Sequence, residues 1–247
     1  MTYCVAVAVN EGLVFLGDSR TNAGMDNVST FRKLSVFETP GERAIVVMGA
    51  GNLAITQSVL GLLNDRFAAG EPSLLTQPSM AAAARLMGDA IREIHRRDGE
   101  SLTRHGVEFN PQFILGGQIR GEPPRLFQIY SPGNFIETTN DTRYLQIGEL
   151  KYGKPIIDRV IGGDTSLAAA AKCALISMDS TIRSNLSVGM PLDLAIVRAD
   201  DLRITEHRRI EEHDEYFRGI RSGWGEALQQ AFFALPDYKI PIGRGRS

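Results

Sequence analysis

The stretch MTYCVAVAVNEGLVFLGDSR (residues 1–20) contains the pattern that decides the fold. From Tyr3 to Val9, larger side chains alternate with Cys or Ala, so both faces of this predicted strand are apolar. The segment 10–12 (Asn-Glu-Gly) has the composition of a turn, and residues 13–16 form the returning strand of a hairpin. The sequence therefore predicts that the chain begins with a hairpin whose strands are buried on both faces.

The order of the remaining elements indicates what covers those faces. Helices are expected in pairs or after groups of strands, not singly after each strand, which disfavours a doubly wound parallel sheet. Two stacked antiparallel sheets with helices on both outer sides would bury strands of this kind. We therefore expect an α+β fold, a four-layer α/β/β/α sandwich of two antiparallel sheets flanked by helices. The further expected strands are 34–37, 43–48, 113–119, 126–130, 192–198 and 204–208, and the expected helices are 53–69, 80–95, 167–180 and 213–235.

Length and composition narrow the class of protein. The 247 residues are expected to form one domain, 1–247, with a C-terminal helical extension at about 211–247. A net charge of -2 does not favour nucleic acid or an anionic membrane as a partner, and no apolar run is long enough to span a membrane. The N-terminus lacks the pattern of a secretory signal, and two distant cysteines, Cys4 and Cys173, are expected in apolar cores. These features predict a cytoplasmic protein.

Thr2 is a candidate nucleophile because a small second residue permits removal of Met1. The product would carry a hydroxyl and an α-amine on one residue, and an amine with a pKa near 8 can act as the base for that hydroxyl. Asp18 closes the second strand, and hairpin pairing would bring it near the chain start. Lys33 opens the next strand on the same side, where its charge would stabilise an alkoxide and where Asp18 would orient it.

Together, Thr2, the Gly-Asp-Ser-Arg turn at 17–20 with Thr-Asn-Ala-Gly behind it, and Lys33 resemble the proteasome β-subunit family. The segment 49–57 (Gly-Ala-Gly-Asn-Leu-Ala-Ile-Thr-Gln) is similar to that family's glycine-rich turn between a strand and a helix. Within the family, the run at 184–193 and the C-terminal extension resemble Anbu, the bacterial ancestral β-subunit. The resemblance implies an N-terminal nucleophile (Ntn) hydrolase fold and a threonine-type peptidase without a cofactor. In it, Thr2, Asp18 and Lys33 would be catalytic, and the Gly51 N–H would form the oxyanion hole.

The resemblance also implies further site residues. Arg20 and Gly49 would lie at the substrate pocket. The family's usual Ser in a Gly-Ser-Gly turn is absent from the turn expected at 146–149, and the later support for the amine aligns with Ser184 and Ser187. Glu149 is expected to be a solvated residue at a helix start.

Other classes fit less well. Gly49-x-Gly51 is not followed by the parallel strand of a dinucleotide fold, and Pro155 stands where a P-loop needs Ser or Thr. The sequence has no Gly-x-Ser-x-Gly elbow and no spaced set of metal ligands, and its histidines are expected at the surface.

The resemblance to the proteasome β-subunit family implies a peptide or protein substrate and a homo-oligomer, either a ring or an open spiral. It leaves open an ATP-dependent unfoldase as a partner, and the alternative of a weakly active or inactive scaffold subunit.

Overall fold

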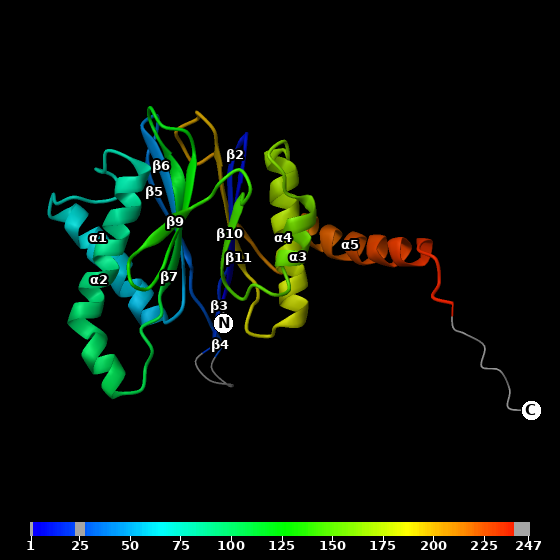
Figure 1. Cartoon of the computed structure of the whole chain (residues 1–247), viewed down its shortest axis with the longest axis horizontal. Helices are drawn as coiled ribbons and strands as arrows, with labels where there is room; N and C mark the ends of the chain where they lie inside the picture. The colour runs from blue at the N-terminus through cyan, green and yellow to red at the C-terminus, as the bar shows by residue number, and fades with distance from the viewer. Residues whose placement is uncertain (1, 23–27, 240–247) are drawn as a thin grey trace, which may run out of the picture.

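The structure, a computed structural model, describes residues 2–22 and 28–239. Met1, the Ala23-Gly24 part of the turn motif and the last part of the expected extension lie outside the described residues. Two five-stranded sheets stack face to face, with helices on both outer sides (Figure 1). The expected four-layer sandwich of two antiparallel sheets is therefore confirmed.

The first sheet has the strand order β10-β1-β2-β11-β12, and every neighbouring pair is antiparallel. Its strands are β1 (Tyr3–Val9), β2 (Gly12–Asp18), β10 (Tyr144–Gly148), β11 (Leu192–Arg198) and β12 (Glu206–Ile210). The hairpin predicted from the first twenty residues forms its centre. Because β10 pairs with β1, a segment from the middle of the chain lies directly beside the chain start.

The second sheet has the order β5-β6-β7-β8-β9 and is also antiparallel. Its strands are β5 (Leu34–Thr39), β6 (Arg43–Ala50), β7 (Gln112–Ile119), β8 (Arg125–Ile129) and β9 (Phe135–Glu137). A short hairpin, β3 (Arg20–Asn22) with β4 (Val28–Thr30), links the two sheets along the chain.

Helices cover both outer faces (Figure 1). The second sheet is covered by α1 (Leu53–Ala68) and α2 (Met80–Arg104), and the first by α3 (Lys154–Val160) and α4 (Leu167–Ser184). The last helix, α5 (Glu215–Ala234), contacts α4 and then extends away from the body. No helix in the described ranges is both long enough and apolar enough to cross a membrane.

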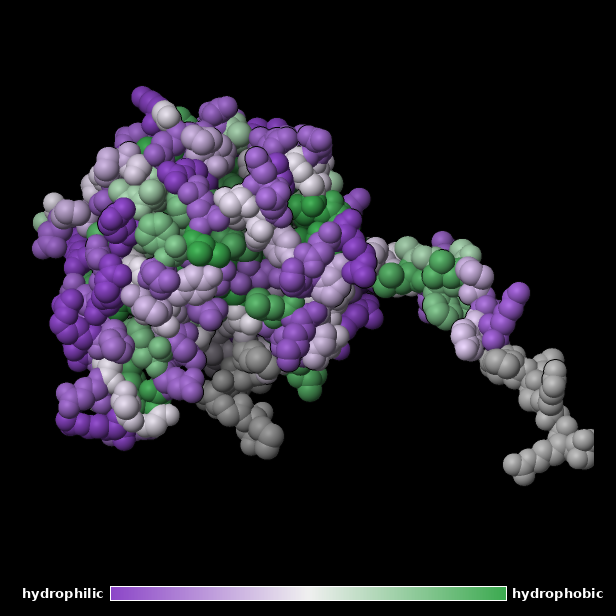
Figure 2. All heavy atoms as spheres, in the orientation of Figure 1, coloured by the Kyte–Doolittle hydropathy of each residue, from purple (hydrophilic) through white to green (hydrophobic). Residues whose placement is uncertain are grey.

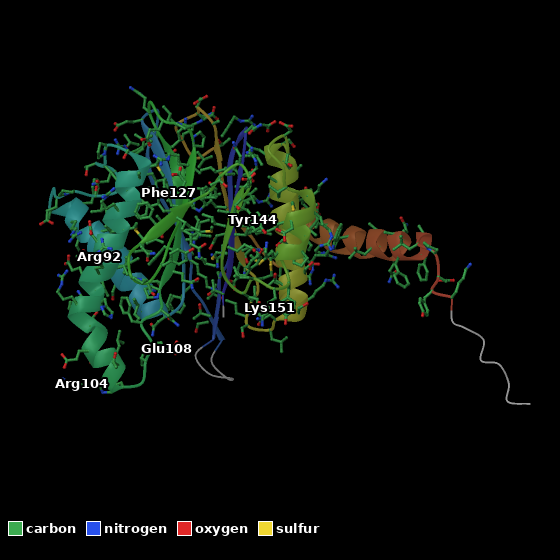
Figure 3. All side chains as sticks on the ribbon, viewed as in Figure 1. Arg92, Arg104, Glu108, Phe127, Tyr144 and Lys151 are labelled. Carbon is green, nitrogen blue, oxygen red and sulfur yellow. The ribbon has the colours of Figure 1, made fainter. Side chains whose placement is uncertain are left out.

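Three apolar layers hold the four structural layers together, and side chains fill the spaces between them (Figure 3). Alternation along β1 divides its side chains between two of these layers. Tyr3 and Val5 point toward α4, while Cys4 and Ala6 point toward the other sheet. The expectation of a strand buried on both faces is confirmed, as is burial of the two cysteines.

Several expected boundaries differ from the structure. The helix predicted at 80–95 continues to Arg104, and the segment 146–149, expected as a turn, largely belongs to β10. The sequence reading missed β9, β10, α3 and the β3–β4 hairpin. These elements are short, and Gly148 and Gly153 interrupt the local pattern, so tertiary contacts decide their structure.

The two sheets lie close together where β7 carries Gly116. A Cβ built at Gly116 would lie 2.7 Å from the Leu126 side chain and 2.9 Å from the Phe15 ring, which belongs to the opposite sheet. By contrast, a Cβ at Gly61, on helix α1, would have no neighbour within 4 Å. Of these two positions, only Gly116 requires glycine for steric reasons.

We predict that Gly116→Val lowers the free energy of unfolding by about 1–3 kcal/mol, because the added atoms overpack the space between the sheets. Gly61→Ala should raise it by roughly 0.5–1 kcal/mol, because alanine favours the helix. Urea unfolding followed by circular dichroism would measure both. Equal stability of the two variants would contradict this account of the sheet packing.

Candidate functional site

Thr2 lies immediately before β1 and is held by its backbone. Its carbonyl oxygen accepts a hydrogen bond from the Glu149 N–H at 2.7 Å, and the next residue, Tyr3, donates its N–H to Asp18 Oδ1 at 3.0 Å. Gly148 makes the first contact feasible. It has φ +86°, and a Cβ there would come within 2.0 Å of the Thr2 carbonyl oxygen. The chain start is therefore fixed between β2 and the end of β10.

Asp18, the last residue of β2, is completely buried and accepts hydrogen bonds from three separate segments. Oδ1 accepts from Tyr3 N at 3.0 Å and from Lys33 Nζ at 2.7 Å, while Oδ2 accepts from Gly189 N at 3.2 Å. Burial raises the pKa of the Asp18 carboxyl, and the Lys33 charge and the hydrogen bonds oppose that rise. These donors are the groups that favour its ionised form.

Lys33 lies just before β5 and is only 8% exposed. Besides its ion pair with Asp18, its Nζ donates to the Arg20 carbonyl oxygen at 2.7 Å. Its own carbonyl accepts from Gly49 N at 3.0 Å, which ties it to the end of β6. The ammonium group is thereby held in one position.

A small pocket of about 40 Å³ brings four of the predicted residues together. Thr2 and Lys33 form one part of its lining, and Gly49 and Gly51 form another. The remaining lining residues are Arg32, Ala50, Leu53, Thr56, Gln57 and Leu60. An alcohol, an ammonium group and a glycine-rich turn thus surround one space, which is an arrangement suited to nucleophilic attack on a carbonyl.

Gly51 has a backbone conformation that suits only glycine. Its φ is +102°, and a Cβ would lie 2.4 Å from the Asn110 carbonyl oxygen. Helix α1 begins two residues later, and the side chain of its N-cap, Asn52, accepts from Ala54 N at 3.0 Å. The turn therefore lies at the positive end of a helix dipole, which favours an anion.

Arg20 differs from the expectation that it lines the substrate pocket. Its guanidinium donates to the Leu186 carbonyl oxygen at 3.0 Å and packs against Gly189, and it is not among the pocket residues. Its contribution to the site is its carbonyl oxygen, which accepts from Lys33. Gly49, in contrast, does line the pocket.

The two serines aligned with the family's support for the amine lie beyond α4. Ser184 is the exposed last residue of α4, and the backbone N–H of Ser187 donates to Asn185 Oδ1 at 2.9 Å. The residue that reaches this part of the site is Asn185, whose Nδ2 donates to Glu149 Oε2 at 3.0 Å. The sequence reading missed Asn185, because an alignment by residue type favours the neighbouring serines.

The expectation for Glu149 was wrong. Glu149 is only 8% exposed and lies five residues before α3 begins at Lys154, so it is neither solvated nor at a helix start. The reason is the pairing of β10 with β1, which carries Glu149 inward beside Thr2. A strand ending in Gly148 could not be distinguished from a turn without that pairing.

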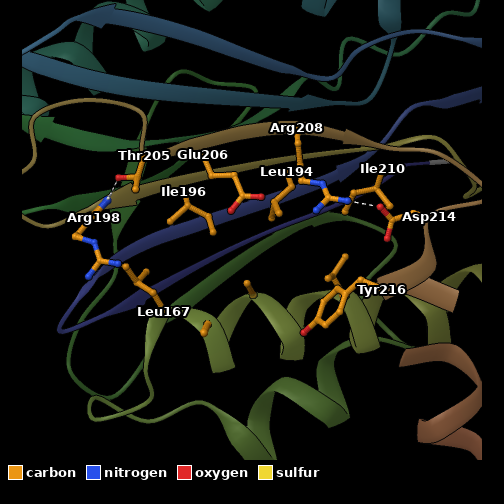
Figure 4. A pocket seen from close by; sticks show the side chains of 13 residues that line it. Leu167, Leu194, Ile196, Arg198, Thr205, Glu206, Arg208, Ile210, Asp214 and Tyr216 are labelled. Atoms are coloured by element: carbon orange, nitrogen blue, oxygen red, sulfur yellow. Dashed lines mark hydrogen bonds and ion pairs between the residues drawn. The ribbon is translucent and has the colours of Figure 1, made fainter. Parts of the chain in front are cut away.

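Other parts of the described chain do not present comparable chemistry. A larger pocket of about 370 Å³ lies between α4 and the β11–β12 edge. Leu167 of α4 and Leu194 and Ile196 of β11 line it with apolar side chains, and Arg208 pairs with Asp214 (Figure 4). Its described lining residues include no lysine and no glycine, so it lacks the combination of groups found around Thr2. Within 2–22 and 28–239, no group of three or more His, Cys, Asp or Glu is placed to hold a metal ion. All four histidines are exposed, as expected.

Known proteins are similar to this chain in sequence and in structure. No family model matches the chain. It is 24% identical over 213 residues to a proteasome subunit beta of Haloquadratum walsbyi, covering 85% of this chain and 79% of that protein. It is 54% identical to the solved structure of Anbu (ancestral beta-subunit) from Yersinia bercovieri, with TM-score 0.90, covering 96% of this chain and all of the other.

A further solved structure, the helical assembly of the Anbu complex from Pseudomonas aeruginosa, is 50% identical with TM-score 0.92 and covers 96% of this chain and 98% of its own. The sequence identity is about 50% over nearly the whole length of both chains, and the two-sheet sandwich is the same. These two findings assign the chain to a family. The chain belongs to the Anbu family of proteasome-like Ntn hydrolases.

Proposed function

We propose that this protein is a cytoplasmic, threonine-type peptidase or amidase subunit of a homo-oligomer, and that Thr2 is its nucleophile once Met1 is removed. The observation that carries the proposal is the shared pocket, in which Thr2 lies with Lys33 and Gly51. The buried Asp18–Lys33 ion pair supports it, because such a pair holds an ammonium group charged and oriented. The family assignment supports the reaction class.

In the proposed reaction, the α-amine of mature Thr2 takes the hydroxyl proton, directly or through one water. The Thr2 oxygen attacks the carbonyl carbon of a peptide or amide, and the Lys33 ammonium stabilises the negative charge that develops on the attacking oxygen. The Gly51 N–H stabilises the tetrahedral oxyanion. The leaving amine takes a proton from the α-ammonium, and water then hydrolyses the acyl-enzyme.

The decisive test uses a peptide epoxyketone, which reacts with an N-terminal threonine, and detects the adduct by intact mass. We predict labelling of the mature protein, slower labelling of Thr2→Ser, and none of Thr2→Ala, because alanine has no hydroxyl to attack with. Labelling that persists in Thr2→Ala at another residue would contradict the assignment of the nucleophile. An unlabelled mature protein would instead favour the non-catalytic scaffold.

The Asp18–Lys33 pair gives a second prediction. Asp18→Asn should lower the free energy of unfolding by roughly 3 kcal/mol, because it leaves the Lys33 charge buried without its counterion. It should also slow epoxyketone labelling. Asp158→Asn is the matched control, because its partner Lys154 is half exposed and such a pair contributes less than about 1 kcal/mol. Urea unfolding would compare the variants, and equal losses would contradict the role of the buried pair.

We also propose that α5 is an assembly contact. The helix extends from the body with apolar side chains on its surface (Figure 2), and Phe232 and Phe233 are 71% and 80% exposed. Exposing two adjacent aromatic side chains to water is unfavourable in a single subunit. Such an apolar patch marks a surface for protein contact. The related Pseudomonas protein forms a helical assembly, which is the behaviour expected of a contact that does not close into a ring.

Replacing both Phe232 and Phe233 with serine should shift the protein toward smaller species, because it removes apolar area from the contact. Sedimentation velocity over a range of concentrations would measure the change. Gln229→Ser, an exposed substitution on the same helix, serves as the control and should leave the distribution unchanged. An unchanged distribution of the double variant would exclude this end of α5 from the assembly.

A further inference from the structure

Glu149 is a buried carboxylate whose described partners are all neutral. Its Oε1 accepts from Lys151 N at 3.1 Å and its Oε2 from Asn185 Nδ2 at 3.0 Å. Within the described part of the chain, no lysine, arginine or histidine forms an ion pair with it, although it is only 8% exposed. Burial of an ionised carboxylate is costly unless a positive charge compensates it.

The mature chain start would supply that charge. The Glu149 N–H already binds the Thr2 carbonyl oxygen at 2.7 Å, and only the Thr2 backbone separates this oxygen from the α-nitrogen. Removal of Met1 converts that nitrogen from a neutral amide into an amine that can carry a proton. Processing therefore gives a group that can carry a positive charge to the residue whose carbonyl oxygen binds the Glu149 backbone.

We propose that Glu149, held by Asn185, is the positioning carboxylate of the Thr2 α-amine. The inference rests on the proposed function, because it assigns a partner to the base of that reaction. Glu149 orients the amine and favours its protonated form, and Lys33 remains the partner of Asp18. The two carboxylates then have separate tasks, one for each of the two positive groups beside the nucleophile.

Asn185 gives the Glu149 carboxylate a single orientation. Its side-chain Oδ1 accepts from Ser187 N at 2.9 Å, which directs Nδ2 toward Glu149 Oε2. Asn185 itself is anchored by its backbone N–H, which donates to the Thr181 carbonyl at the end of α4. A rigid helix end thus positions the amide that positions the carboxylate.

The charges around the amine determine the direction of the expected effect. Lys33 and Arg32, both at the pocket, disfavour a second positive charge, whereas Asp18 and Glu149 favour it. Asp18 is already matched by Lys33, so Glu149 is the carboxylate that offsets the remaining positive field. Neutralising Glu149 should lower the pKa of the α-amine, and the amine would then be free of its proton at lower pH.

The test measures the amine directly, without any substrate. Full-length protein is released from a cleavable N-terminal fusion that leaves Thr2 as the first residue. Trace labelling with acetic anhydride at a series of pH values, read on the N-terminal peptide by mass spectrometry, follows the unprotonated fraction. Glu149→Gln should lower the amine pKa by about one unit, and Glu149→Asp, which keeps the charge, should lower it less.

An unchanged amine pKa in folded Glu149→Gln would overturn the proposal. If that variant does not fold, Asn185→Ala provides the test, because it keeps the Glu149 charge but removes the hydrogen bond that orients it. This variant should lower the amine pKa by several tenths of a unit. No shift there would also overturn the proposal. Epoxyketone labelling of the same samples separates the two hypotheses: a normal Glu149 effect without labelling contradicts only the peptidase function, and labelling without a Glu149 effect contradicts only this inference.

Discussion

The site depends on the interactions of the buried Asp18 carboxylate. It ends β2 in the first sheet and receives Lys33, which precedes β5 in the second sheet. It also receives the N–H groups of Tyr3 and Gly189, from the chain start and from the loop before β11. One carboxylate therefore joins three segments that are remote in sequence, and losing it would leave a buried ammonium group without a counterion.

The close approach of the two sheets makes that arrangement feasible. Small residues on the inner faces, such as Ala6 and Gly116, let the sheets pack closely, and the large side chains of β1 point toward α4 instead. The ends of β2 and β6 then lie near each other, so Lys33 and the turn at Gly51 border the same pocket as Thr2. Packing in the core thus sets distances at the site, where no single loop could do so.

The environment of Thr2 contains two charge systems that differ in origin. The Asp18–Lys33 pair is complete in the unprocessed chain. Glu149, by contrast, has only neutral partners among the described residues, and we infer that its counterion is created by processing. If so, cleavage does more than expose a nucleophile, because it also compensates a buried charge and thereby stabilises the mature site.

The first twenty residues determined the central hairpin, and alternation of large and small side chains determined that both of its faces are buried. Thr2, Asp18 and Lys33 were proposed as site residues from their types, their spacing along the hairpin and the next strand, and the resemblance of that combination to proteasome β-subunits. Only the tertiary structure decided that the Arg20 guanidinium binds the Leu186 carbonyl, that Glu149 lies beside Thr2, and that Asn185 contacts Glu149. Those contacts depend on β10 pairing with β1 and on where α4 ends, and neither long-range pairing nor a helix terminus leaves a periodic signal in the sequence.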